Sequence, residues 1–534
     1  MTYCVGIDLG TTNSTLAYQK VGEEVLRQLS IKQRVDQGME GEQFNLPSFV
    51  LFPPGEELCV GQFAKVRGEE LPDRVVSSAK SWLSHSGVDR RSAFLPLEHD
   101  EKVSPVEAIS LFLSHLKSEW ERQMPPLKEQ TVLITVPASF DPDARAFVQE
   151  AAKMAGYPSI ILLEEPLAAF YAWLWKQREN WRNLIHVGET VLVVDIGGGT
   201  TDFTLIKVEE EEGNLILRRE AVGEHLLLGG DNLDLALAYF VQQKAGKELP
   251  MNALVHSCRT AKEELLSGMK ETSVTVLGQG SALIGNTTKT PLTQEEVQKL
   301  LVDGFFPHVP LETAVQSERK AALSALGLPF VRDPRITAQL ASFLQKHTLP
   351  SAVLFNGGTL KARPFQERLH QVLSDWKGEE VRLLPDPDFD FAVSLGATYY
   401  GAGEGIRVKA PSCRSFWIGV EGAMPAIPGV KPPLQMHCIA PKGLEEGSET
   451  TLDEEFSLVL GEPALFRFFA GEEEAQELPP IEAEMAGEGL AIVKLKAKLT
   501  ELGMLELWCE ADDGRHWNLE FNARPEAIVA SAAF

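Results

Sequence analysis

The feature that most constrains the fold is a corner in which a buried apolar run ends in an acid and then in small residues. Residues 193–202 read VVDIGGGTTD, with Asp195 followed by three glycines, and residues 5–14 read VGIDLGTTNS, with Asp8 at the same place. Backbone amides can approach phosphate closely only where no Cβ intervenes. Two copies about half a large domain apart predict a duplicated α/β unit whose halves face each other.

Together the two corners predict a site for a magnesium triphosphate. Magnesium bound to phosphates is usually held through few carboxylates and several waters, so Asp8 and Asp195 would face one metal from opposite halves. The loop positions predicted to approach phosphate, or to add hydroxyls to phosphate or to the attacking water, are Thr11, Thr12, Gly197, Gly198, Gly199 and Thr200.

A single corner of this kind has another explanation, a tight hairpin in which Asp195 caps its own loop. The second copy argues against this, and so does a third turn, where Gly357 and Gly358 follow the apolar run AVLF. The repeated pattern therefore favours a ligand site over an isolated turn.

Length and composition limit the remaining classes of function. The 534 residues exceed what one hydrophobic core usually supports, and the formal net charge of −26 repels phosphate backbones and anionic membranes. The six cysteines are scattered without a C-x-x-C pair, and no window approaches eighteen uncharged apolar residues. We expect a soluble cytoplasmic protein of two or three folding units that binds neither nucleic acid nor membrane.

Periodicity predicts where the elements lie. A buried strand is expected at 132–136, a helix opened by Asp141 and closed by Gly156, two strands joined by an acidic turn within 202–223, and a helix with a capping box at Thr293. Beyond residue 405 helical periodicity gives way to alternation. Residues 491–521 predict a three-stranded meander that turns near Gly503 and at Asp513.

Seven segments carry a resemblance to a known family. They are GIDLGTTNS, VLITVPASF with DPDAR, LLEEPLAAFYAW, VVDIGGGTTDF, HLLLGGDNLD, TAKEELLS and LFNGGTLKARP. In this order they resemble the seventy-kilodalton heat-shock chaperones, the DnaK-like proteins, over residues 4 to about 403. The resemblance implies an actin-like ATPase domain of duplicated ribonuclease-H-like lobes, with ATP or ADP and Mg²⁺ in the cleft. It also implies a small all-β domain that binds extended apolar peptides.

The resemblance implies specific roles for the matching positions. Asp8 and Asp195 would hold hydrated magnesium, and Thr11, Thr12 and Asn13 would contact phosphate. Lys80, in SSAKSWLSH, matches the catalytic lysine beside the γ-phosphate and the attacking water; the alternative is a lysine at the surface. The implied catalytic set is Lys80, Glu165, Asp195 and Thr200.

Other matching positions surround the ribose and the base. They are Gly229, Gly230, Lys262, Gly357, Gly358, Lys361 and Asp390. Three residues in this region, Lys361, Arg259 and Ser267, depart from the family pattern. Lys361 replaces an arginine and keeps its charge but not its planar stacking. Arg259 stands where relatives often have an acid, and Ser267 lies one position late.

The same resemblance predicts the domain order, with an ATPase domain at 1–405, a linker at 406–415 and a β-sandwich at 416–534 that lacks a helical lid. Pro137, Arg145 and Glu165 match residues that relay the nucleotide state, but the linker lacks the usual apolar run closed by an acid. Phe466, Phe468 and Phe469 could line a peptide groove, or they could form the core of the β domain.

The leading functional hypothesis is a DnaK-like chaperone that slowly hydrolyses ATP with Mg²⁺. Its partners would be unfolded or extended polypeptides or one dedicated protein, with possible J-domain and nucleotide-exchange co-chaperones. Two alternatives of the actin-like superfamily stay open, a small-molecule kinase and a filament or scaffold protein.

Overall fold

The computed structural model describes residues 2–85, 87–157, 160–211, 214–224, 226–277, 287–315, 331–385, 388–403, 408–409, 415–421, 434–442, 444, 448–461, 463–471, 476–477, 481–487, 489–499, 504–511 and 513–522. The chain divides into two compact units, Met1–Arg407 and Val408–Phe534. Most of the linker predicted at 406–415 lies outside the described residues.

The first half of the first unit is built on a mixed sheet with the order β11-β10-β1-β2-β3. Its strands are β1 (Tyr3–Leu9), β2 (Asn13–Lys20), β3 (Leu26–Gln28), β10 (Thr131–Val136) and β11 (Ile161–Glu164), and the short β6 (Asn45–Pro47) also pairs with β2. β1 runs antiparallel to β2 and parallel to β10. The strand predicted at 132–136 is therefore confirmed as β10.

The second half repeats this arrangement in a sheet with the order β18-β17-β12-β13-β14. The strands are β12 (Thr190–Ile196), β13 (Thr201–Glu211), β14 (Asn214–Val222), β17 (Ala352–Asn356) and β18 (Arg382–Leu383). β12 runs antiparallel to β13 and parallel to β17, as β1 does with β2 and β10. The repeated sequence thus corresponds to a repeated strand order, with β1 and β12 as the matching central strands.

Each central strand carries its acid one position before its last residue, after a run of buried and mainly apolar side chains. Every residue of β12 is buried, in a run of valines and isoleucine that suits a strand covered on both faces. The glycine turn after β17 fits closely beneath this end. Gly357 has φ +87°, and a Cβ there would lie 2.3 Å from the carbonyl oxygen of Ile196 and 2.5 Å from Oδ1 of Asp195. Only glycine allows this approach without strain.

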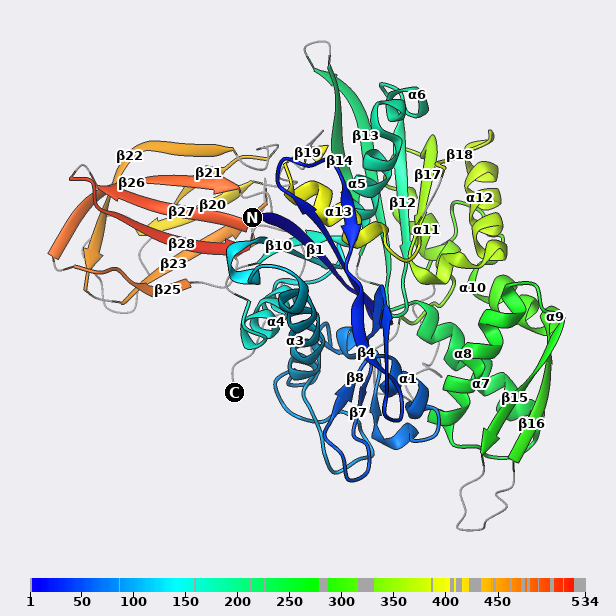
Figure 1. Cartoon of the computed structure of the whole chain (residues 1–534). Coiled ribbons are helices and arrows are strands. Elements are labelled where there is room, and N and C mark those ends of the chain that lie inside the picture. The colour runs from blue at the N-terminus through cyan, green and yellow to red at the C-terminus, as the bar shows by residue number, and fades with distance from the viewer. Residues whose placement is uncertain are drawn as a thin grey trace, which may run out of the picture. The chain divides into compact units, whose positions relative to one another are not determined.

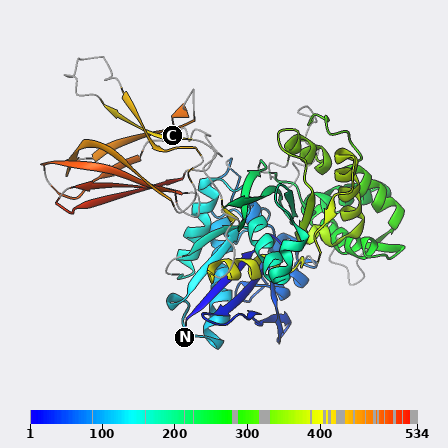
Figure 2. The same ribbon diagram turned by 90° about the horizontal axis from the view of Figure 1, so that it is seen from above.

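Helices cover the two sheets and form a core in each half. The longer ones are α3 (Pro105–Gln123), α4 (Pro142–Met154), α5 (Glu165–Gln177), α7 (Gly230–Ala245), α8 (Met251–Leu266), α11 (Ile336–Leu344), α12 (Arg363–Lys377) and α13 (Ala392–Gly401). Apolar residues of α3 and α4 share one cluster with β1, and those of α7, α8, α11 and α12 share another with β12. α13 lies beside β1 and α5 (Figures 1 and 2).

Shorter elements complete the first unit. The helices are α1 (Gln62–Gly68), α2 (Ala79–Trp82), α6 (Trp181–Leu184), α9 (Gln294–Val297) and α10 (Asp303–Phe305), and the strands are β4 (Ile31–Asp36), β5 (Met39–Gln43), β7 (Val50–Leu51), β8 (Cys59–Val60), β9 (Val75–Val76), β15 (Glu271–Leu277) and β16 (Thr287–Thr293). The β15–β16 hairpin lies beside α7 and α8 (Figure 1).

Two predicted helix starts are confirmed by their caps. The side chain of Asp141 accepts a hydrogen bond from the backbone N–H of Ala144 at 2.7 Å, so α4 begins where expected, and the helix ends just before Gly156. Thr293 and Glu296 form the predicted capping box at the start of α9. Such caps satisfy N–H groups that have no partner within the helix.

The described part of the second unit consists of strands, drawn from yellow to red in Figure 2. One sheet contains β20 (Phe416–Glu421), β21 (Leu434–Ala440), β23 (Pro463–Ala470), β24 (Gln476–Glu477) and β25 (Ile481–Glu484). The other has the order β22-β26-β27-β28, with β22 (Glu449–Leu460), β26 (Gly489–Leu499), β27 (Met504–Ala511) and β28 (His516–Asn522). β26 to β28 form the predicted meander; its turn near Gly503 lies outside the described residues.

The aromatic residues considered for a peptide groove divide between core and surface. Phe468 is fully buried in a cluster with Phe416 and Leu507, and Phe466 packs against that cluster while partly exposed. For Phe468 the core interpretation is therefore confirmed. A bilayer crossing needs about 20 apolar residues in one helix, and within the described ranges no helix meets that requirement.

The packing of α13 on α5 generates a first prediction. A Cβ at Gly396 would lie 1.7 Å from the carbonyl oxygen of Ala168. Gly396→Ala should therefore push the helices apart and lower the free energy of unfolding by about 1–3 kcal/mol, which thermal unfolding will measure. Gly304→Ala is the matched control, because an added Cβ there meets no described heavy atom within 4 Å. Equal losses in the two variants would contradict the close approach.

Candidate functional site

The site is built at the ends of strands that lie side by side in each sheet. On the second sheet Asp195 pairs in register with Asp202 of β13 on one side and with Asn356 of β17 on the other. The Nδ2 of Asn356 donates a hydrogen bond to Oδ2 of Asp195 at 2.8 Å. On the first sheet Thr135 of β10 donates to Oδ1 of Asp8 at 3.3 Å. Each acid is thus fixed by a donor from the neighbouring parallel strand.

These strand ends open into a cavity of about 500 Å³. That volume lies within the range of about 300–1,000 Å³ usual for small-molecule sites. Most of the predicted residues line it: Asp8, Thr11, Thr12, Asn13, Glu165, Asp195, Gly197, Gly198, Thr200, Gly230, Lys262, Gly357, Gly358, Lys361 and Asp390. Residues predicted from three strand-to-loop turns, and from both halves, therefore surround one space.

Three predicted residues lie just behind this lining, namely Lys80, Gly199 and Gly229. A Cβ at Gly199 would lie 2.2 Å from Oγ of Ser81, and one at Gly229 would lie 2.7 Å from the carbonyl oxygens of Gly197 and Gly198. These two glycines are therefore explained by the packing of loops against each other. Their predicted contact with a ligand stays a prediction.

Lys80 is a buried residue rather than a surface lysine, since only 3% of its side chain is exposed. Its ammonium group forms an ion pair with Oε1 of Glu165, which lines the cavity. α2 carries Lys80, while Glu165 is the first residue of α5. A buried cation needs such a partner, and the pair holds a positive charge directly behind the cavity wall.

The acids of the site repel one another in a buried setting. Burial first, and then the charge of Glu165, raises the pKa of Asp8 to about 7. Burial and the charges of Glu165 and Asp202 raise the pKa of Asp195 well above its usual value. Burial also raises the pKa of Glu165, although Lys80 opposes the shift. The carboxylates therefore outnumber the nearby ammonium group, and a bound cation would relieve the repulsion.

Magnesium with phosphate fits this set of residues. Among the described residues no group of three or more acids, histidines or cysteines is arranged to hold a metal ion by protein ligands alone. Mg²⁺ in phosphate sites typically uses one or two carboxylates and keeps several waters. Asp8 and Asp195, one from each half, have the chemistry for that arrangement.

The glycine turn at 197–199 is hydrogen-bonded to the start of α7 and to Thr359. Its carbonyl oxygens accept hydrogen bonds from the backbone N–H of Gly230 at 3.0 Å and from that of Asp231 at 2.7 Å. The hydroxyl of Thr359 donates to the carbonyl of Gly197 at 2.8 Å. The turn and the start of α7 therefore form one preorganised wall.

Arg259 and Lys361, the residues that depart from the family pattern, both form ion pairs. Nε of Arg259 lies 2.6 Å from Oδ2 of Asp234, and Nζ of Lys262 lies 2.6 Å from Oδ1 of the same residue. Although burial raises the pKa of Asp234, the two cations lower it overall. Lys361 forms an ion pair with Asp390. The two replaced positions are thus neutralised by protein acids.

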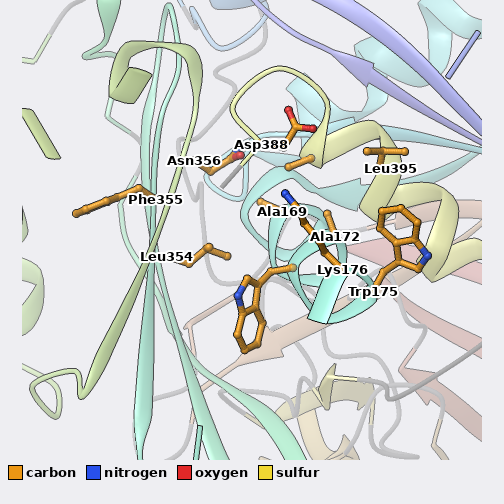
Figure 3. A pocket seen from close by; sticks show the side chains of 11 residues that line it. Ala169, Ala172, Trp175, Lys176, Leu354, Phe355, Asn356, Asp388 and Leu395 are labelled. Atoms are coloured by element: carbon orange, nitrogen blue, oxygen red, sulfur yellow. The ribbon is translucent and has the colours of Figure 1, made fainter. Parts of the chain in front are cut away.

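A smaller cavity of about 70 Å³ lies between α5, β17 and α13 (Figure 3). Its wall is largely apolar, with Ala169, Ala172, Leu354 and Leu395, and Asn356 and Asp388 stand at one end. The space holds only a few waters and is too small for a nucleotide. The larger cavity, which Asn356 also lines, is therefore the candidate site.

Two of the residues predicted to relay the nucleotide state, Arg145 and Glu165, form ion pairs with different partners. Arg145 contacts Glu164, at 3.4 Å between Nη2 and Oε1, and Arg219 contacts the same carboxylate at 2.8 Å. Glu165, the next residue, faces Lys80 instead. The relay role of Arg145 stays a prediction, and the structure pairs this arginine with Glu164.

Sequence reasoning missed several residues of the site. Asp202 accepts a hydrogen bond from the backbone N–H of Ser139 at 3.0 Å, and the hydroxyl of Thr200 helps to lower its raised pKa. Asp202 and Asn356 stand opposite Asp195 in the strand register. A pairing of the predicted strands would have identified both. Strand pairing would not have identified Asp231 and Ser78, because their hydrogen bond joins segments that are distant in the sequence.

The chain matches the model of a known protein family. The family model described as Hsp70 protein matches residues 4–316 of the chain. The matched range contains both acid-bearing corners, Lys80 and Glu165, whereas the turn at Gly357 and the second unit lie beyond it.

The raised pKa of Asp8 predicts a pH dependence of the ligand-free protein. Because the pKa of Asp8 is raised to about 7 in the folded chain from an ordinary value near 3.8, folding stability is lost as the pH rises between these values. Asp8→Asn should therefore raise the Tm over that of the parent protein at pH 8 by several degrees, with little change at pH 4. Thermal unfolding without nucleotide or Mg²⁺ measures this difference. The exposed Asp100→Asn is the control, and a Tm gain independent of pH would contradict the repulsion.

Proposed function

Because the chain belongs to the Hsp70 family, whose members are ATPases with an actin-like fold, we propose that the large cavity binds ATP with Mg²⁺ and hydrolyses it slowly. The observation that carries the proposal is the meeting of Asp8 and Asp195, from equivalent strand ends of the two halves, at one cavity edged by glycine turns. A nucleotide bound there would contact both halves at once.

Asp8 and Asp195 are the residues proposed to hold the metal, and a bound Mg²⁺ would neutralise phosphate charge. Thr11, Thr12 and Asn13 would receive the phosphates from the first half. The fixed turn at 197–199 would receive them from the second half, where loops already hydrogen-bonded to α7 need little reorganisation on binding.

Lys80 and Glu165 are proposed as the centre of hydrolysis. In ATP hydrolysis a water oxygen attacks the γ-phosphorus, the bond to the bridging oxygen breaks, and ADP and phosphate leave. The ammonium of Lys80, held by Glu165, would stabilise the negative charge of the transferring group. The hydroxyl of Thr200, bonded to Asp202, would orient the water or a phosphate oxygen.

The ribose and base would occupy the end of the cavity nearest Lys262. Gly230, Gly357 and Gly358 supply close backbone approach there, and the ion pair of Lys361 with Asp390 stands at the rim. Arg259 is proposed to support this wall through Asp234 rather than to stack on the base.

We further propose a chaperone role in the cytoplasm, in which the nucleotide controls binding of unfolded or extended polypeptide. Hsp70 proteins generally bind unfolded polypeptides and co-chaperones, and the family match over residues 4–316 supports the proposal. The strands of the second unit are the proposed client-binding part, and J-domain and exchange factors are the proposed co-chaperones. A nucleotide-dependent affinity for an unfolded peptide would test the coupling.

Lys80→Ala tests the hydrolytic centre. The variant should bind ATP with Mg²⁺ within about tenfold of the parent affinity, because the cavity lining is unchanged. Its single-turnover rate of hydrolysis should fall about 100-fold or more, since a preorganised charge beside the transferring group is lost.

The exposed Lys153→Ala is the control and should hydrolyse ATP like the parent protein. Near-normal hydrolysis by Lys80→Ala would refute the proposed role. Turnover that rises with small polyols but not with unfolded peptide would favour a kinase instead, and ATP-dependent sedimentation at micromolar protein would favour a filament.

A further inference from the structure

The segment that leads into α2 holds an unusual backbone conformation. Ser78, just before Ala79, has φ +54° and ψ +29°, in the left-handed region that residues other than glycine seldom adopt. Such conformations persist where surrounding contacts determine them. Here Oγ of Ser78 donates a hydrogen bond to Oδ2 of Asp231 at 2.6 Å. Because Lys80 follows two residues later, this contact sets the direction of the helix that carries it.

Asp231 connects three parts of the site. Its backbone N–H donates to the carbonyl oxygen of Gly198 at 2.7 Å, and Oδ1 of its side chain accepts from Nη2 of Arg259 at 2.8 Å. Only 8% of Asp231 is exposed. A buried carboxylate with several donors is held firmly, since each lost partner would leave a charge unsatisfied. Asp231 therefore ties the glycine turn and α8 to α2.

The far end of this chain of contacts reaches the cavity wall. Arg259 is fixed in turn by Asp234, which also pairs with Lys262. Both cations and both acids line the cavity. Contacts therefore run without a break from the proposed ribose wall, through Arg259 and Asp231, to Ser78 in the other half.

α2 also packs directly on the glycine turn. Oγ of Ser81 occupies the place that a Cβ at Gly199 would take, 2.2 Å from it, and is buried without a hydrogen-bond partner among the described residues. The position of α2 is therefore sensitive to the turn on one side and to Asp231 on the other.

We infer that Ser78 and Asp231 are positioning residues that hold Lys80 against the glycine turn and so couple the ribose wall of one half to the hydrolytic centre of the other. The inference rests on the proposed ATPase function. It predicts that loss of the Ser78 hydroxyl slows hydrolysis without weakening nucleotide binding, because Ser78 acts through Lys80.

Single-turnover ATP hydrolysis by Ser78→Ala tests this directly. The rate should fall roughly tenfold, as expected when a reacting group is misplaced, while the KM for ATP stays within about twofold. Ser78→Asn should recover the rate to within about threefold of the parent, because asparagine tolerates the left-handed region and its amide can donate to Asp231. Ser77→Ala is the matched control and should hydrolyse ATP at the parent rate.

Two further measurements separate positioning from general damage. In the Lys80→Ala background, Ser78→Ala should cause no additional loss of rate, and an additive loss would overturn the inference. Amide hydrogen exchange of residues 79–83 without nucleotide should quicken in Ser78→Ala and in Asp231→Asn but not in Ser77→Ala. Unchanged exchange would overturn the inference even if the protein proved not to hydrolyse ATP, whereas absent hydrolysis in the parent protein would instead refute the proposed function.

Discussion

The character of the cavity is set by carboxylates that the two halves of the first unit bring together in one buried place. Asp8 and Asp195 lie near the ends of equivalent strands, and Glu165 and Asp202 add negative charge around them. Burial first, and then the charge of Glu165, raises the pKa of Asp8 to about 7. Lys80 and the amide of Asn356 offset part of it. A bound cation would relieve the remainder, and the proposed magnesium nucleotide would supply that cation together with anions for the glycine turns.

The fold accounts for how the acids come so close. The same strand order occurs in both sheets, so the same loop positions lead into the cavity from opposite sides. Close packing also fixes the elements around the cavity. α13 meets α5 at Gly396, and the turn at Gly357 passes beneath the end of β12. These glycines serve two different purposes, since one lets helices approach and the other lets a loop reach an acid.

Much of this arrangement could be predicted from local sequence. The paired corners predicted Asp8 and Asp195, and spacing predicted β10, α4 and the capping box of α9. Local patterns could not identify contacts that depend on register or on distant segments. Asp202 and Asn356 enter the site because they stand opposite Asp195, and Arg145 meets Glu164 because a neighbouring strand and helix fix their directions. Likewise, no spacing rule links Ser78 to Asp231.

The adjacent glutamates at the start of α5 show how narrow the tolerance of this region is. Glu164 ends a strand and faces two arginines, whereas Glu165 begins a helix and faces one lysine. Because the strand ends and the helix begins between them, the two glutamate side chains point toward different cations. A shift of one position in this segment would leave the composition unchanged but would turn Glu165 toward the arginines and Glu164 toward the lysine. The chain length between β10 and α5 therefore matters here as much as residue identity.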